Sequence, residues 1–204
     1  MNASQISPLA MALIVSGSLF LIAATALAAL RRDPGSSFSW LFVAGISYSL
    51  LGLAAAAYSP ESDGARAAVT QLLAVLLAAA IGVLCPARGA GEAGRLEALP
   101  VVAYATAWLT LVGIAPTIGF HGKILIYRSL LAAGWEGVAA LAVAGSAAAL
   151  LPALRALSSI SVGPIRGLRA VLVAVLLAAI VALGLYPQAG LAIAAWVTQP
   201  AAAA

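Results

Sequence analysis

The chain has 204 residues, of which 64 % are hydrophobic and only 8 % are charged. Soluble domains carry about a quarter charged residues, so ten basic and six acidic side chains cannot coat a water-soluble globule of this size. The net charge of +4 comes largely from arginines that stand singly or in pairs between apolar runs. This distribution argues against nucleic-acid binding. The long apolar runs lack two-residue alternation and predict an all-α integral membrane protein.

Three apolar runs in the first part of the chain reach the length of about 20 residues that a helix needs to cross a bilayer. They span residues 8–30, 38–58 and 67–85, and each is followed by arginines or a proline. No basic segment precedes the first run, which is also longer than the apolar core of a secretory signal. We therefore expect the first run to be a retained transmembrane helix.

The segment 100–133 has 34 residues and as one helix would be about 51 Å long, too long for a hydrocarbon core of about 30 Å. Pro116 in its middle removes a backbone donor and disfavours helix at Ala115, and nearby glycines make unwinding inexpensive. We predict a discontinuous helix that stops near Ile114 and resumes near Gly119. The residues expected to form the break are Gly113, Pro116, Gly119 and Gly122.

Two further spans are expected at residues 137–157 and 168–186, with a short apolar tail, 191–197, at the interface. The prediction is one transmembrane domain over residues 1–204 with about six transmembrane helices, the fourth discontinuous. An N-terminus outside places seven arginines in inner loops and two in outer loops, which satisfies the positive-inside rule. We expect a multi-pass protein of the inner (cytoplasmic) membrane with both termini outside. The inner arginines are Arg31, Arg32, Arg88, Arg95, Arg155, Arg166 and Arg169, and the outer ones are Arg66 and Arg128.

Lys123, the only lysine, follows the expected break directly. Burying it at mid-membrane costs about 2.5–3.5 kcal/mol, so it is either a protonatable group that loads and releases a proton or a lysine that snorkels to the interface. His121 either relays protons or hydrogen-bonds as a packing residue. Tyr48 is a third candidate, which lines a hydrated path or only joins two helices.

Other kinds of site are not indicated. Cys85 is the only cysteine, so the sequence predicts no intrachain disulfide and no cysteine-based metal site. We find no metal-ligand spacing, catalytic triad or phosphate-binding loop. We therefore expect no catalytic residue, no metal and no cofactor.

The residues in and around the expected break resemble a known family. The run from Leu109 to Lys123, LTLVGIAPTIGFHGK, is similar to the broken-helix motif of the antiporter-like subunits of respiratory complex I, roughly LSLAGIPPTAGFxGK. The segment 45–48 stands where the family often has Ser-Ile-Ser-His, and 184–187 resembles its Gly-Leu-Tyr-Pro. The similarity is closest to the N-type, quinone-proximal member in complex I and to the D-type antiporter protein of Mrp complexes. It covers only the C-terminal part of such proteins, their second five-helix repeat and last helix.

The resemblance implies a truncated antiporter-like subunit of a complex I-like or Mrp-like assembly, with a proton or cation half-channel at Lys123, His121 and Tyr48. Its expected partners are other integral membrane subunits, at least one of them antiporter-like. It implies a non-catalytic subunit of an ion-translocating oxidoreductase or antiporter. The family's histidine on the upstream helix is Tyr48 here, and no carboxylate lies inside a predicted span. A structural membrane subunit with a decayed ion path therefore remains the alternative.

Overall fold

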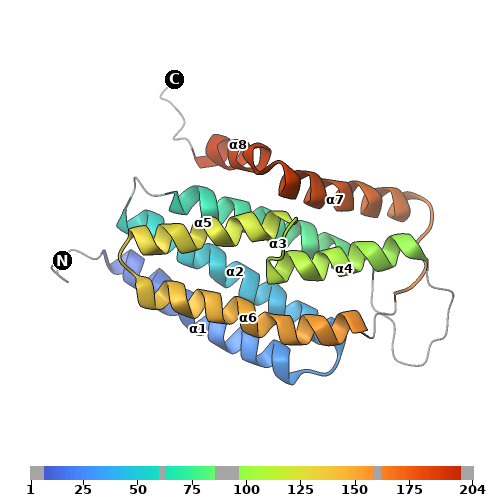
Figure 1. The fold of residues 1–204 in the computed structure, drawn as a ribbon, viewed down its shortest axis with the longest axis horizontal. Coiled ribbons are helices and arrows are strands. Elements are labelled where there is room, and N and C mark those ends of the chain that lie inside the picture. Colours follow the sequence, from blue (N-terminus) through green and yellow to red (C-terminus); the bar gives the residue numbers. More distant parts are fainter. Residues whose placement is uncertain (1–6, 60–62, 86–96, 159–161, 199–204) are drawn as a thin grey trace.

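A computed structural model describes residues 7–59, 63–85, 97–158 and 162–198. Over these residues the chain forms eight helices that run alongside one another in a single bundle (Figure 1). They are α1 (Pro8–Leu30), α2 (Pro34–Tyr58), α3 (Gly64–Leu84), α4 (Ala98–Val112), α5 (Ile118–Ala132), α6 (Glu136–Ser158), α7 (Leu168–Leu185) and α8 (Pro187–Thr198). Within the described ranges, five of them are long and apolar enough to cross a membrane: α1, α2, α3, α6 and α7. The predicted all-α membrane fold is confirmed.

The discontinuous fourth span is also confirmed. Helices α4 and α5 have 15 residues each, about 22 Å, so neither crosses a hydrocarbon core of about 30 Å alone. Figure 1 shows them end to end, together covering the length of the bundle. The break comprises residues 113–117, and the second half begins at Ile118, one residue earlier than expected. Together, α4 and α5 therefore form one crossing, the fourth in chain order, in addition to the five long helices.

Helix α2 starts four residues earlier than the apolar pattern indicates. Asp33 is the N-cap, and its carboxylate accepts a hydrogen bond from the Ser36 backbone N–H at 2.7 Å. Pro34 follows as the first helical residue, where its missing N–H costs nothing. Local capping thus extends the helix into polar residues. Helix α3 likewise starts at Gly64, three residues before the expected 67.

The apolar tail forms helix α8, which packs against α3 and continues the line of α7 along the bundle (Figure 1). Pro187 begins α8 because a proline fits the first turn of a helix but not the interior of a continued α7. Gly190 and Ala194 are its buried residues. These small side chains let α8 approach the bundle closely, so the tail packs along its side.

The two ends of the bundle differ in charge. Helix α1 begins and helix α8 ends at the same end (Figure 1). The opposite end carries the α1–α2 connection, the end of α6 and the start of α7, with Arg31, Arg32, Arg155, Arg166 and Arg169. Arg66 and Arg128 belong to the first end, whereas Arg88 and Arg95 lie outside the described residues. This asymmetry matches the one counted from the sequence.

Small residues set the spacing of helices α2 and α3. A Cβ placed on Gly45 would lie 2.5 Å from Cγ2 of Val75, and one on Gly52 would lie 3.1 Å from Cβ of Ala68. The two helices are antiparallel, and both glycines face the same seam. Close approach at small residues is the usual source of helix association in lipid, where van der Waals packing replaces the hydrophobic effect.

We predict that Gly45→Ala lowers the stability of the protein by about 1–3 kcal/mol, because the added methyl overpacks the α2–α3 seam against Val75. Val75→Ala in the same chain should restore most of the loss. Gly137→Ala is the matched control, because nothing lies within 4 Å of its added Cβ. Thermal unfolding in mild detergent measures all three, and equal effects of Gly45→Ala and Gly137→Ala would contradict the seam.

Candidate functional site

Lys123 is buried in the bundle at the first turns of α5, with 3 % of its surface exposed. Its Nζ donates hydrogen bonds to the carbonyl oxygens of Leu111 at 3.0 Å and Val112 at 2.6 Å. These carbonyls belong to the last turn of α4, where the break has removed their intrahelical partners. They also form the negative end of the α4 dipole. The interruption of the helix therefore creates the cation site that Lys123 occupies.

Gly113 allows the Lys123 side chain to reach the last turn of α4. It ends α4 in the left-handed conformation, with φ +84°, and its N–H donates to Leu109 O at 2.9 Å. A Cβ there would lie 2.6 Å from Cδ of Lys123. Glycine is thus required both by the backbone angle and by the lysine side chain that lies against it.

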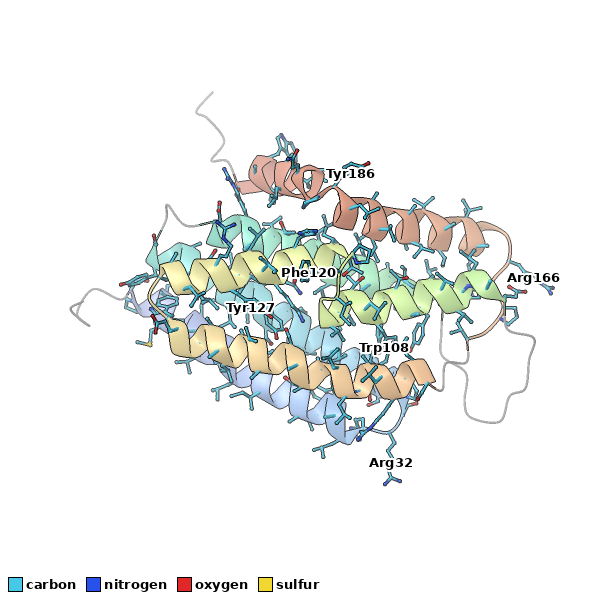
Figure 2. All side chains as sticks on the ribbon, viewed as in Figure 1. Arg32, Trp108, Phe120, Tyr127, Arg166 and Tyr186 are labelled. Atoms are coloured by element: carbon cyan, nitrogen blue, oxygen red, sulfur yellow. The ribbon has the colours of Figure 1, made fainter. Side chains whose placement is uncertain are left out.

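A cluster of hydroxyl groups surrounds the lysine on its other side. Nζ donates to Oγ of Ser146 on α6 at 3.1 Å and lies 4.3 Å from the ring centroid of Tyr48 on α2. Ser146 Oγ is 2.8 Å from Oη of Tyr48 and 2.7 Å from Oη of Tyr127 on α5. Figure 2 shows Tyr127 in the space between α5 and α6. The cluster joins three helices around one ammonium group.

One arrangement of protons satisfies every group in this cluster. Tyr48 Oη donates to Ala142 O at 2.7 Å, so it accepts from Ser146. The Ser146 oxygen then accepts from both Tyr127 and Lys123, which uses its two lone pairs. The three ammonium protons go to Leu111 O, Val112 O and Ser146 Oγ. Carbonyl and hydroxyl dipoles, with the tyrosine ring, replace the water that a charged lysine loses on burial.

Gly119 and Gly122 differ in role from the expectation that they help to unwind the helix. Both lie inside α5, where they allow close contact. A Cβ on Gly119 would overlap Thr110 O, and one on Gly122 would lie 2.6 Å from Oε1 of Gln71. Of the four predicted break residues, only Gly113 and Pro116 stand in the break itself. Pro116 follows a cis peptide bond, in a turn closed by Thr117 N–H and Ile114 O at 3.1 Å.

His121 lies apart from the lysine cluster. Its Nε2 is 2.7 Å from the carbonyl oxygen of Gly184 on α7, and its ring packs edge-on against Phe120. A Cβ on Gly184 would overlap Pro116 O, so α7 lies directly against the break. The structure thus places Lys123 and Tyr48 together but directs His121 toward another helix. Its contacts match the packing interpretation of this histidine.

Polar groups without partners lie next to the cluster, between α2 and α3. Ser49 and Gln71 fall at the same level, because Gly45 faces Val75 and Gly52 faces Ala68 on either side of them. Gln71 is fully buried, and neither its amide nitrogen nor its oxygen has a hydrogen-bond partner among the described residues; the same holds for Ser49 Oγ. Buried amides and hydroxyls are normally paired with protein or water. The seam therefore holds buried polar groups without partners, one of which, Gln71, lies against Gly122 directly before Lys123.

The sequence pointed to Lys123 and Tyr48 but not to Ser146 or Tyr127. Tyr127 stands four residues after Lys123, which places both on one face of α5, so helical spacing alone was sufficient to find it. Ser146 interrupts an alanine-rich run with the only hydroxyl near the middle of α6. That signal was available, but a lone serine in a membrane helix is also common as a simple packing residue.

These features define a multi-pass all-α membrane protein with a buried lysine at an interrupted helix. No group of three or more His, Cys, Asp or Glu side chains that could hold a metal ion occurs within the described ranges.

The fold is similar to a chain in the structure of the Mrp complex from Dietzia sp. DQ12-45-1b, with a TM-score of 0.74 and 23 % sequence identity. The match covers 94 % of this chain and 48 % of that chain, so this chain spans about half the length of its structural relative. Searches with protein-family models and against curated proteins returned no match.

We predict that Gly113→Ala destabilises the protein by more than the roughly 1–2 kcal/mol that a left-handed alanine costs, because its Cβ also displaces the Lys123 side chain. Gly134→Ala is the matched control: φ there is +75°, it also follows the end of a helix, and it is exposed. The loss of stability beyond that of a left-handed alanine should disappear when Lys123 is also replaced by alanine. Equal losses for the two glycine variants in thermal unfolding would show that no such contact exists.

Proposed function

We propose that the chain is an antiporter-like membrane subunit of an Mrp-like or complex I-like assembly, in which it contributes a proton or cation half-channel through Lys123. The observation that carries this proposal is the burial of the only lysine on the free carbonyls of an interrupted membrane helix. Ionisable groups at membrane depth are costly and are usually retained for ion movement. Interrupted helices often form ion sites in transporters. The fold shared with a chain of an Mrp complex supports the same assignment.

The hydrogen bonds around Lys123 suggest how a proton would leave it. When the ammonium loses a proton, the amine has two donors and one lone pair. Of its three hydrogen-bonded neighbours, only Ser146 carries a proton to donate back, since the other two are carbonyls. For the proton to leave, Ser146 would first turn its hydroxyl from Tyr48 to Tyr127. It would then take a proton from Lys123 while its own proton passes to Tyr127, and Tyr127 would release its phenolic proton to the next acceptor along the path. Ser146 is left donating to the neutral amine. This chain of hydroxyls favours a proton over a metal cation at this position.

The path should lead toward the end of the bundle where α1 begins and α8 ends (Figure 1). Tyr127 follows Lys123 by one turn of α5, and α5 ends at that same end (Figure 1). We propose that this end faces outside, because the opposite end carries the larger number of arginines. Both termini would then lie outside the inner membrane.

The exposed helix break supports partner subunits. Ala115 and Pro116 are exposed, and within the described part of the chain the Ala115 N–H has no hydrogen-bond partner. Non-helical backbone at membrane depth is tolerated only where protein or a water-filled cavity surrounds it. We propose that another membrane subunit, antiporter-like itself, covers this face.

A structural subunit with a decayed ion path is the second candidate. Every ammonium proton of Lys123 has an acceptor, and no Asp or Glu lies in the interior of a described helix. A lysine so fully bonded can serve as a fixed cap on α4 and nothing more. The two candidates differ in whether Lys123 changes its protonation during turnover.

The deciding experiment is transport by Lys123→Ala and Lys123→Arg, each purified with its partners and reconstituted in proteoliposomes. Arginine keeps the charge but does not release a proton at accessible pH. We expect both variants to assemble and both to lose proton or cation transport. Tyr127→Phe should lower the rate while leaving assembly intact, because it removes one hydroxyl of the path.

Ser129→Ala serves as the control for these variants. Its hydroxyl only bonds Leu125 O within the same helix, at 2.9 Å, so transport should not change. If Lys123→Ala and Lys123→Arg assemble and transport at the rate of the unmodified protein, Lys123 is a structural cap and the second candidate is correct.

Partner association gives a separate prediction. We expect a tagged chain, extracted in mild detergent, to co-purify in fixed stoichiometry with other integral membrane subunits, at least one of them antiporter-like. Mass spectrometry of the purified complex identifies them. A stable monomer with transport activity of its own would contradict this proposal.

A further inference from the structure

A pocket opens at the arginine-rich end of the bundle, between the α1–α2 connection and the last turns of α6. Its empty volume, including the open mouth, is about 280 Å³. It is well separated in sequence from the lysine cluster and shares no residue with it. The residues that line it are Arg31, Arg32, Pro34, Ser37, Pro152, Arg155 and Ala156.

Three of the residues that line this pocket are arginines: Arg31, Arg32 and Arg155. Arg31 and Arg32 form no ion pair with a carboxylate in the described part of the chain. Asp33 is next to them in sequence, but its Oδ2 is engaged by the Ser36 N–H at 2.7 Å as the cap of α2. Arg155 donates from Nη1 to Ala29 O at 2.8 Å, which links the end of α6 to α1. Arg31 and Arg32, which no carboxylate of the described chain pairs with, are therefore the groups that an anion at the pocket would meet.

A buried serine anchors the turn that carries Arg31 and Arg32. Ser37 is buried, and its hydroxyl lies 3.1 Å from Ala28 O and 3.3 Å from Arg31 O. This contact fixes the α1–α2 connection against the end of α1. The arginine backbone is thus anchored, while the Arg32 side chain extends away from the bundle (Figure 2). An anion bound here meets a preformed turn.

Exposed apolar side chains occur on the helix ends that form the pocket. Leu154 and Leu151 on α6 are 62 % and 48 % exposed, and Leu30 at the end of α1 is 77 % exposed. Leu151 and Leu154 belong to the same turns of α6 as Pro152 and Arg155, and Leu30 directly precedes Arg31. A ligand that fits both features has an anionic head and long apolar chains.

We propose that this pocket binds the phosphate group of an anionic phospholipid, whose acyl chains lie along α6 and α1. Guanidinium groups match phosphate oxygens in two-pronged hydrogen bonds. Basic pockets between membrane helices at the cytoplasmic surface are suited to acidic lipid head groups. The site is independent of the proposed ion path, because it depends on arginines at one end of the bundle and not on Lys123.

The test is a titration of the protein, purified with its partners, with phosphatidylglycerol, read by native mass spectrometry. Arg31→Gln together with Arg32→Gln should weaken binding about 30-fold, since two surface cations are lost. Adding Arg155→Gln should weaken it further. Arg166→Gln with Arg169→Gln is the matched control, because these exposed arginines lie at the same end but outside the pocket.

Three results would overturn the proposal. Equal weakening by both double variants would mean a general attraction to the basic end. Equal binding of phosphatidylcholine would mean that the negative charge is not recognised. If millimolar inorganic phosphate displaces the lipid, the acyl chains contribute nothing to binding. The pocket would then be a site for a soluble anion. The double variant of Arg31 and Arg32 leaves the Arg155 contact with Ala29 in place, so its fold should be intact.

Discussion

The absence of water from the hydrocarbon core is the constraint on which this structure depends. Interrupting a membrane helix leaves carbonyl groups without partners, at a cost of several kcal/mol each. Burying a lone lysine costs about 2.5–3.5 kcal/mol on the insertion scale. In this chain the two costs offset one another, because the Lys123 ammonium bonds the free carbonyls of Leu111 and Val112. Each therefore lowers the cost of the other.

The helices around the break carry the residues that the contact between Lys123 and the free carbonyls requires. Glycine is needed at Gly113 for the lysine, at Gly122 for Gln71 of α3, and at Gly184 for the Pro116 carbonyl. Helices α2 and α6 contribute Tyr48 and Ser146, which supply the remaining polar contacts of the ammonium. Each helix next to the break therefore either supplies a polar contact or has a glycine where a larger side chain would not fit.

The sequence predicted the spans well, because a bilayer demands about 20 apolar residues per helix and a break demands proline or glycine. It could not predict which side of α5 each residue faces. His121 and Lys123 are two residues apart, and helix geometry turns them toward α7 and α6 respectively. The early start of α2 depends on the Asp33 cap, a local polar contact that an apolar pattern does not register. Ser146 was missed because its meaning comes from three partners on other helices.

The partners of Lys123 also bear on how it can act. A carboxylate within reach would fix the ammonium as an ion pair and oppose the release of its proton. Among the described residues, the lysine is held only by carbonyl and hydroxyl dipoles and by the face of the Tyr48 ring. Such dipoles stabilise the charged form but carry no net charge, so a charge arriving nearby can alter the balance. A site of this kind suits a group that is switched by an outside charge. Under the proposed function, a subunit that covers the exposed break at Ala115 would bring that charge.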